Sequence, residues 1–186
     1  MRLMLVSDIF GDTPALRQLA EAIDGNAKIV HPYRDISPAF NTEQDAYQYF
    51  SERVGLAQYA QFLLQELKDT PAPVFLLGFS VGASAIWQLS GQLEPDKIAL
   101  AKGYYGSQIR NHLSLTPCFP MELVFPASEP HFCVAELMAA LQSKQNLIIR
   151  QTEFRHGFMN KLSVNFCREG YQQELEVLNN CFTQQH

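Results

Sequence analysis

The stretch that decides the fold is residues 74–89, which read Val74-Phe75-Leu76-Leu77-Gly78-Phe79-Ser80-Val81-Gly82-Ala83-Ser84-Ala85-Ile86-Trp87-Gln88-Leu89. The apolar run at its start is typical of a buried parallel strand, and its last seven residues follow a helical pattern. A G-x-S-x-G sequence joins the two, and its glycines let the strand and helix backbones approach closely. Gly and Ser are common in ordinary turns, so the pattern alone is weak. Between a strand and a helix, however, it predicts a sharp turn that exposes Ser80 as a nucleophile.

The composition predicts one folded domain that spans residues 1–186. The chain is 47% hydrophobic and 18% charged, and its length suffices to bury a sizeable core. The net charge of -5 is mild and no dense Lys/Arg cluster occurs, so we expect neither nucleic acid nor an anionic membrane surface as a partner. The first residues are too short an apolar run for a signal peptide or a membrane span. Four cysteines without zinc-like spacing indicate free thiols in the cytoplasm.

Strand-like and helix-like patterns alternate along the chain. We expect strands at residues 3–6, 27–30, 74–77, 97–104, 121–125 and 147–151. We expect helices at residues 14–23, 42–68 (with a break near Gly55), 81–89, 132–142 and 169–182. Such alternation predicts a mostly parallel sheet with helices on both faces. Residues 31–41 carry Pro32 and Pro38, and we interpret them as a loop over the pocket.

A serine nucleophile needs a histidine to take its proton and a carboxylate to orient the histidine. On a sheet of this kind they follow in the order Ser, acid, His, each at the carboxyl end of a strand. His156 comes just after the last predicted strand, and Gly157 lets the loop turn sharply there. His131 is the second choice, because it follows a proline and is expected to open a helix. The remaining candidates are weaker: His112 lies in a polar loop and His186 ends the chain.

The carboxylate should follow the strand at residues 121–125. Glu129 has that position, whereas Glu122 falls inside the strand and Glu153 lies beyond the next one. A glutamate at such a place is often only a solvated loop residue, and the chain order is what favours Glu129.

An oxyanion formed during attack would need two backbone N–H donors. Val81, directly after the nucleophile at a helix N-terminus, is the first expected donor. Ile9 or Phe10, in the loop after the first strand, is the expected second donor. The alternative is that this is an ordinary loop between a strand and a helix.

Five segments together, in chain order, resemble the dienelactone hydrolase family: Asp8-Ile9-Phe10-Gly11, Gly78-Phe79-Ser80-Val81-Gly82, Tyr104-Tyr105-Gly106, Glu129-Pro130-His131-Phe132 and His156-Gly157-Phe158. The resemblance spans nearly the whole chain. It implies an α/β-hydrolase fold in a compact version without a separate cap domain. It also implies that Asp8 lies near Ser80, where the alternative is a capping or solvated turn residue.

The sequence departs from this family at several places. The typical family enzymes use cysteine where Ser80 stands, and an aspartate where Glu129 stands. They also carry arginines for a substrate carboxylate. Asn160 occupies one of these places, with Lys161 adjacent, and Arg34 loosely resembles the other. The substrate is therefore not necessarily a dienelactone.

The sequence thus predicts a serine hydrolase that cleaves an ester, thioester or lactone bond in a small-molecule substrate. No metal or organic cofactor is implied. Phe10, Phe79 and Tyr105 are expected to line the substrate pocket, although each is also a candidate core residue. Two alternatives stay open: a hydrolase-like protein that binds without catalysis, and an acyltransferase. The sequence does not indicate an oligomeric state.

Overall fold

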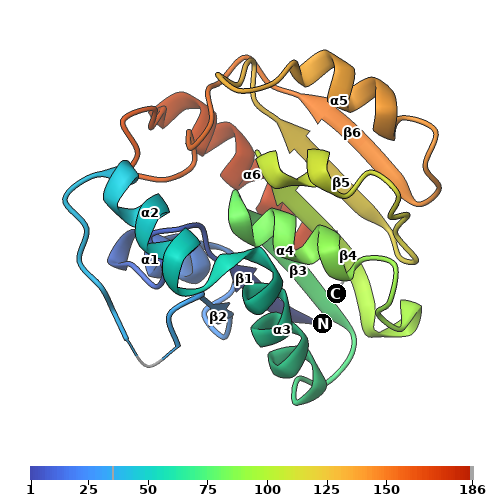
Figure 1. The fold of residues 1–186 in the computed structure, drawn as a ribbon. Coiled ribbons are helices and arrows are strands. Elements are labelled where there is room, and N and C mark those ends of the chain that lie inside the picture. Colours follow the sequence, from blue (N-terminus) through green and yellow to red (C-terminus); the bar gives the residue numbers. More distant parts are fainter. Residues whose placement is uncertain (35, 185–186) are drawn as a thin grey trace.

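A six-stranded sheet forms the centre of the molecule in this computed structural model, which describes residues 1–34 and 36–184 (Figure 1). Across the sheet the strands are β2 (Lys28–Val30), β1 (Arg2–Val6), β3 (Val74–Phe79), β4 (Ile98–Tyr104), β5 (Met121–Phe125) and β6 (Leu147–Gln151). Every neighbouring pair of these strands is parallel. The parallel sheet expected from the alternating pattern is confirmed.

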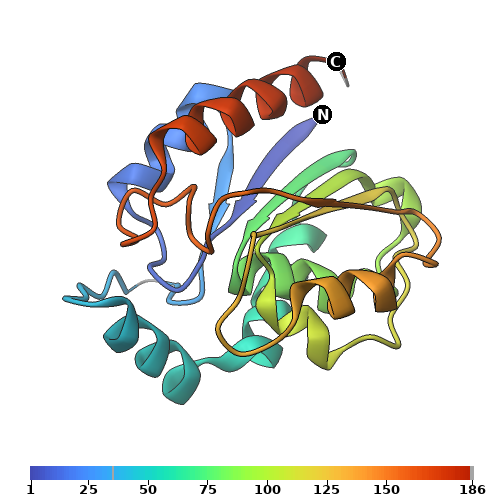
Figure 2. The ribbon, with the colours of Figure 1, turned by 90° about the horizontal axis from the view of Figure 1, so that it is seen from above.

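Helices cover both faces of the sheet. They are α1 (Pro14–Ile23), α2 (Glu43–Arg53), α3 (Gly55–Lys68), α4 (Val81–Leu89), α5 (Val134–Leu141) and α6 (Arg168–Gln184), with short 3-10 helices η1 (Pro95–Lys97) and η2 (Ser107–Asn111). The view from above shows α1 and α6 on one face and α3, α4 and α5 on the other (Figure 2). This layering is the reason that the central strands β1 and β3 read as nearly continuous apolar runs.

The core consists of two apolar clusters, one on each face. Along β1, Met4 and Val6 belong to one cluster, whereas Leu3 and Leu5 belong to the other. Successive side chains of a strand point to opposite faces, so one unbroken apolar run supplies both clusters.

One predicted helix divides where the sequence indicated a break, and another begins later than the sequence pattern predicts. The helix expected at residues 42–68 is two helices, α2 and α3, which meet at Gly55 with a φ of 73° that favours glycine. The helix expected from residue 132 begins only at Val134, because Glu129 and Phe132 form an antiparallel bridge that holds the preceding residues in a turn. His131 therefore lies in this turn and does not open the helix.

The strand order explains where a site can form. β1 lies between β2 and β3, so the chain leaves the carboxyl ends of β1 and β3 in opposite directions. A crevice opens at such a switch point, and ligands of open parallel sheets bind there. The loops that begin at residues 7 and 80 both start at this crevice.

Two further findings concern the whole described chain. Within residues 1–34 and 36–184, no helix combines the length and apolar character that a membrane crossing requires. All four cysteines have free thiols.

Candidate active site

Ser80 occupies a strained turn between β3 and α4. Its φ is 50°, in the left-handed region that non-glycine residues rarely adopt, and its backbone N–H donates to the Tyr104 carbonyl at 2.9 Å. A Cβ at Gly82 would lie 2.2 Å from the carbonyl oxygen of Val6, so α4 can pack against β1 only with glycine there. The turn thus places the Ser80 side chain at the carboxyl edge of the sheet, where 9% of the residue is exposed.

The structure brings Ser80, His156 and Glu129 into one hydrogen-bonded chain. The Ser80 Oγ lies 3.1 Å from His156 Nε2, and His156 Nδ1 lies 2.6 Å from Glu129 Oε1. His156 stands in the loop after β6, whose position is held by Asn165 through a 2.9 Å bond from its Nδ2 to the His156 carbonyl. Glu129 comes from the turn between β5 and α5. Three loops far apart in sequence therefore supply the three side chains.

Glu129 is more deeply buried than His156, so its carboxylate faces the imidazole and little solvent. The side chain of Glu129 is 7% exposed, whereas that of His156 is 32% exposed. With an acceptor-only carboxylate at Nδ1, that nitrogen carries the ring proton, and Nε2 is left to accept the Ser80 hydroxyl proton. The ring of Tyr105 packs beside the imidazole at a centroid distance of 4.9 Å.

The other candidates from the sequence lie elsewhere. Glu122 is ion-paired with Lys102 and Arg150, and Glu153 is exposed. His112 follows η2, and His131 is an exposed residue at the rim of the same cleft as Ser80. His186 lies outside the described residues.

Two backbone N–H groups that line the cleft with Ser80 lack an acceptor in the described part of the chain. Among the described residues, no hydrogen-bond acceptor is recorded for the N–H of Val81 or of Ile9. The N–H of Phe10, the alternative donor, is instead bonded to Asp8 Oδ1 at 2.9 Å. The hydroxyl of Tyr33 donates to the Ile9 carbonyl and so fixes this loop.

Asp8 faces the same cleft as Ser80. Its Oδ1 accepts from Phe10, and its Oδ2 accepts from Asn160 Nδ2 at 2.6 Å. Burial raises the pKa of Asp8 above its usual value, and these two hydrogen bonds oppose the rise. The residue therefore organises the loop after β1 and also presents a carboxylate to the cleft.

The cleft that contains Ser80 has a volume of about 430 Å³. Phe10 and Tyr105, two of the expected pocket residues, line it, and so do Ile9 and Val81, the expected oxyanion donors. Glu129 and His156 complete this part of the lining. One wall comes from the start of α2, through Glu43, Gln44 and Tyr47, whereas none of the described residues of the loop at 31–41 lines the cleft.

Two of the predicted substrate-binding residues lie outside this cleft. Arg34 is exposed, and its guanidinium lies 4.1 Å from the centroid of the Phe62 ring on α3. Arg34 follows β2, and β2 lies at the edge of the sheet beyond β1, away from the crevice between β1 and β3. Phe79 is buried, and its ring stacks on that of Tyr104 at 5.4 Å.

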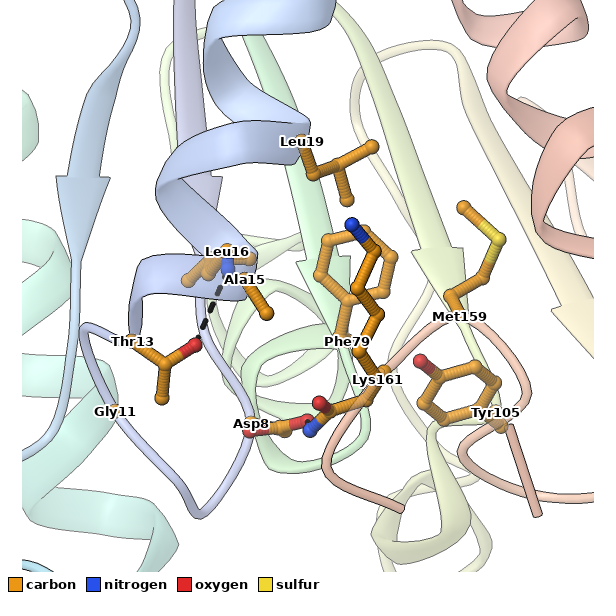
Figure 3. A pocket seen from close by; sticks show the side chains of 11 residues that line it. Asp8, Gly11, Thr13, Ala15, Leu16, Leu19, Phe79, Tyr105, Met159 and Lys161 are labelled. Atoms are coloured by element: carbon orange, nitrogen blue, oxygen red, sulfur yellow. Dashed lines mark hydrogen bonds between the residues drawn. The ribbon is translucent and has the colours of Figure 1, made fainter. Parts of the chain in front are cut away.

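A smaller cavity adjoins the cleft and shares Asp8, Tyr105 and Asn160 with it. Figure 3 shows it between α1, the Phe79 ring and the Met159–Lys161 segment. The Tyr105 hydroxyl points into this cavity. That hydroxyl is buried and has no hydrogen-bond partner within normal geometry among the described residues, although the Met159 backbone N–H faces it.

Sequence reasoning missed several cleft residues, chiefly Glu43, Tyr47 and Arg110. Glu43 and Tyr47 stand one turn apart on α2, and a helical plot would have placed them on one face. Arg110 lies six residues after the carboxyl end of β4. This position predicts that it lies at the same edge of the sheet as Ser80. The sequence does not reveal which face of α2 points toward the cleft, because that depends on how α2 packs against the rest of the fold.

No group of three or more His, Cys, Asp or Glu side chains in the described part of the chain is arranged to hold a metal ion.

Comparison with known proteins gives one sequence relative and several structural neighbours. The uncharacterized protein YczH of Bacillus subtilis (strain 168) is 35% identical over 142 residues, which cover 74% of this chain and 68% of YczH. No protein-family model matches the chain. A provisionally named dienelactone hydrolase from Klebsiella pneumoniae subsp. pneumoniae superposes with a TM-score of 0.73 at 15% identity, over 98% of this chain and 86% of that one. The dienelactone hydrolase of Anabaena variabilis gives a TM-score of 0.67 at 13% identity, over 99% and 86%.

Proposed function

This chain belongs to the same family as YczH of Bacillus subtilis, and from its fold and site we propose that it is a serine hydrolase for a small ester, thioester or lactone. The fold is the α/β-hydrolase fold that the sequence predicted, and it is shared with dienelactone hydrolases. The proposed reaction is acyl transfer from the substrate to Ser80, followed by hydrolysis.

The observation that carries the proposal is the hydrogen-bonded chain from Ser80 through His156 to Glu129. His156 Nε2, at 3.1 Å, is within reach of the Ser80 hydroxyl proton, and Glu129, at 2.6 Å, stabilises the imidazolium that forms. Ser80 Oγ attacks the carbonyl carbon as it gives this proton to His156. The imidazolium then protonates the leaving group, and an acyl-enzyme is left on Ser80.

Water completes the cycle by the same route. His156 takes a proton from water as the water attacks the acyl carbon, and then returns a proton to Ser80 Oγ as the acid departs. The N–H groups of Val81 and Ile9 stabilise the negative oxygen in both steps. Their lack of acceptors among the described residues supports this role.

The test is hydrolysis of short p-nitrophenyl esters by wild-type protein, Ser80→Ala and His156→Ala. We expect each variant to lose activity by about 10⁴-fold or more while circular dichroism shows a folded protein. Ser51→Ala, on an exposed face of α2, and His112→Ala are matched controls that should retain the wild-type rate. Retention of near wild-type turnover by either active-site variant would refute the proposal.

Two further measurements separate the alternatives. A fluorophosphonate probe should label Ser80 in the wild-type protein, and failure to label would favour binding without catalysis. Product analysis with added alcohol or thiol acceptors should give mainly the free acid. A product that is mainly the transferred ester would identify an acyltransferase.

A further inference from the structure

The cleft around Ser80 carries an uneven distribution of charge. Asp8, Glu43 and Glu129 bring three carboxylates to its lining, whereas Arg110 is the one Lys or Arg side chain that lines it in the described part of the chain. Glu129 is bonded to His156. The other two carboxylates make no ion pair with a basic side chain among the described residues.

Asp8 and Glu43 lie on the same side of the cleft. Asp8 lies in the loop two residues after β1, and Glu43 begins α2. The Oε1 of Glu43 is close enough to the His156 loop that a Cβ on Gly157 would lie 4.0 Å from it. Burial is the main cause of the raised pKa of Asp8, and the negative charge of nearby Glu43 adds to it. Neutral donors alone satisfy Asp8, because its partners are the Phe10 N–H and the Asn160 amide.

Two aromatic side chains near these carboxylates have features that suit a cation. The Tyr105 hydroxyl is 1% exposed, has no partner within normal hydrogen-bond geometry in the described structure, and points into the cavity that Asp8 also lines (Figure 3). The Met159 backbone N–H faces its oxygen, which has a second lone pair that can accept a further hydrogen bond. Tyr47 lies one turn after Glu43, lines the cleft and is 54% exposed, so much of its aromatic side chain is accessible to a ligand.

Arg110 stands apart from this wall. Its guanidinium stacks on Phe132 at 4.9 Å and donates to the Ser107 carbonyl at 2.5 Å. Both contacts belong to the η2 and α5 side of the cleft, which lies across the sheet edge from α2 (Figure 1).

We propose that the wall formed by Asp8, Glu43 and Tyr47 receives a cationic group of the substrate, an ammonium or a trimethylammonium. The inference rests on the proposed hydrolase function and names its substrate class. An anionic acyl group is disfavoured on this wall, because among the described residues that line the cleft no Lys or Arg side chain lies beside the two carboxylates.

The test compares esters that differ only in charge. The first set is the p-nitrophenyl esters of γ-trimethylammoniobutyric acid, of its uncharged tert-butyl isostere and of glutaric acid. A second pair, acetylcholine and its uncharged tert-butyl analogue, carries the charge in the leaving group. We expect kcat/KM for the cationic ester to exceed that for its isostere by about tenfold in at least one pair, and to fall toward it as salt is added.

Glu43→Gln should reduce this preference, the ratio of the two kcat/KM values, by about threefold, as expected for one half-exposed charge. Asp45→Asn is the matched control, because Asp45 has the same charge in the same first turn of α2 but does not line the cleft. The control should leave the ratio unchanged. Equal reductions by both variants would indicate only a long-range field and would overturn the proposal.

The outcomes separate this inference from the proposed function. Hydrolysis of the neutral ester without any preference for the cation overturns the inference alone. A preference for the glutarate ester that Arg110→Gln removes also overturns it, since Arg110 would then set specificity. If no ester is hydrolysed, the proposed function fails. Calorimetry with tetramethylammonium then decides the inference: binding that weakens in Glu43→Gln but not in Asp45→Asn supports it, and no binding overturns it.

Discussion

At the scale of single residues, the site depends on one short bond between a buried carboxylate and a half-exposed imidazole. We expect Glu129→Gln to lower kcat/KM for p-nitrophenyl butyrate by about 10³- to 10⁴-fold, measured by steady-state kinetics. A glutamine side chain can donate to Nδ1 at the 2.6 Å contact, which favours the imidazole tautomer with its proton on Nε2. That tautomer cannot accept the proton of Ser80.

The matched control for this prediction is Glu153→Gln. Glu153 lies three residues before His156 and is exposed, so its removal changes the net charge near the site without touching the imidazole. An unchanged rate in Glu129→Gln, or an equal loss in the control, would mean that Glu129 does not orient His156.

At the scale of elements, the contact between β1, β3 and α4 holds the nucleophile turn. A Cβ on Gly82 would meet the carbonyl oxygens of Val6 and Ser7 at 2.2 and 2.5 Å, and backbone atoms cannot move aside as a side chain can. We therefore expect Gly82→Ala to lower the free energy of unfolding by about 3 kcal/mol, measured by urea denaturation, and to reduce ester hydrolysis.

Gly25→Ala tests whether that loss is specific. A Cβ at Gly25 would meet the flexible end of the Glu21 side chain at 3.2 Å, which can rotate away. This variant should stay within about 0.5 kcal/mol of the wild-type stability. Similar stability of the two variants would show that the close approach of α4 to β1 is not required.

At the scale of the whole molecule, a network of ion pairs and hydrogen bonds connects the sheet to the C-terminal helix α6. Glu174 on α6 accepts two 2.7 Å bonds from Arg150 on β6 and one 2.8 Å bond from the Tyr104 hydroxyl on β4. On β5, Glu122 bonds the same arginine and also Lys102, which is 1% exposed. The network connects the last three strands of the sheet to the helix that packs beside α1.

Glu174→Gln should lower the free energy of unfolding by about 2 kcal/mol near neutral pH. Burial alone would raise the pKa of Glu174, but the bonds from Arg150 and Tyr104 outweigh it and lower the pKa below the usual 4.5. The folded state therefore binds this proton more weakly than the unfolded state does. The stabilisation is present above about pH 4.5 and is lost as the pH falls through the lower folded pKa.

Thermal unfolding at several pH values checks this prediction. The gap in Tm between wild type and Glu174→Gln should narrow as the pH falls below about 4.5. Glu176→Gln, on the exposed side of α6, should give no such gap. A gap that stays constant with pH would mean that packing, and not the charge of Glu174, accounts for the loss.

The parts of the fold that follow from local pattern could be predicted. The central strands β1 and β3 are nearly continuous apolar runs, because both of their faces are covered, and Gly55 marks the division between α2 and α3. The start of α5 could not be predicted, because it depends on the bridge between Glu129 and Phe132. Arg34 was also misplaced, since sequence spacing does not reveal on which side of the switch point β2 lies.

By itself, the stretch around Ser80 determined a strand, a strained turn and a helix, because glycine spacing and apolar runs act over a few residues. The order of Ser80, Glu129 and His156 along the chain likewise predicted that they act together. Only the tertiary structure decided that these three side chains meet at 3.1 and 2.6 Å, and that Glu43, Tyr47 and Arg110 share their cleft. The physical reason is that the cleft is assembled from loops whose distances depend on strand order and helix packing, and neither is encoded in any one segment.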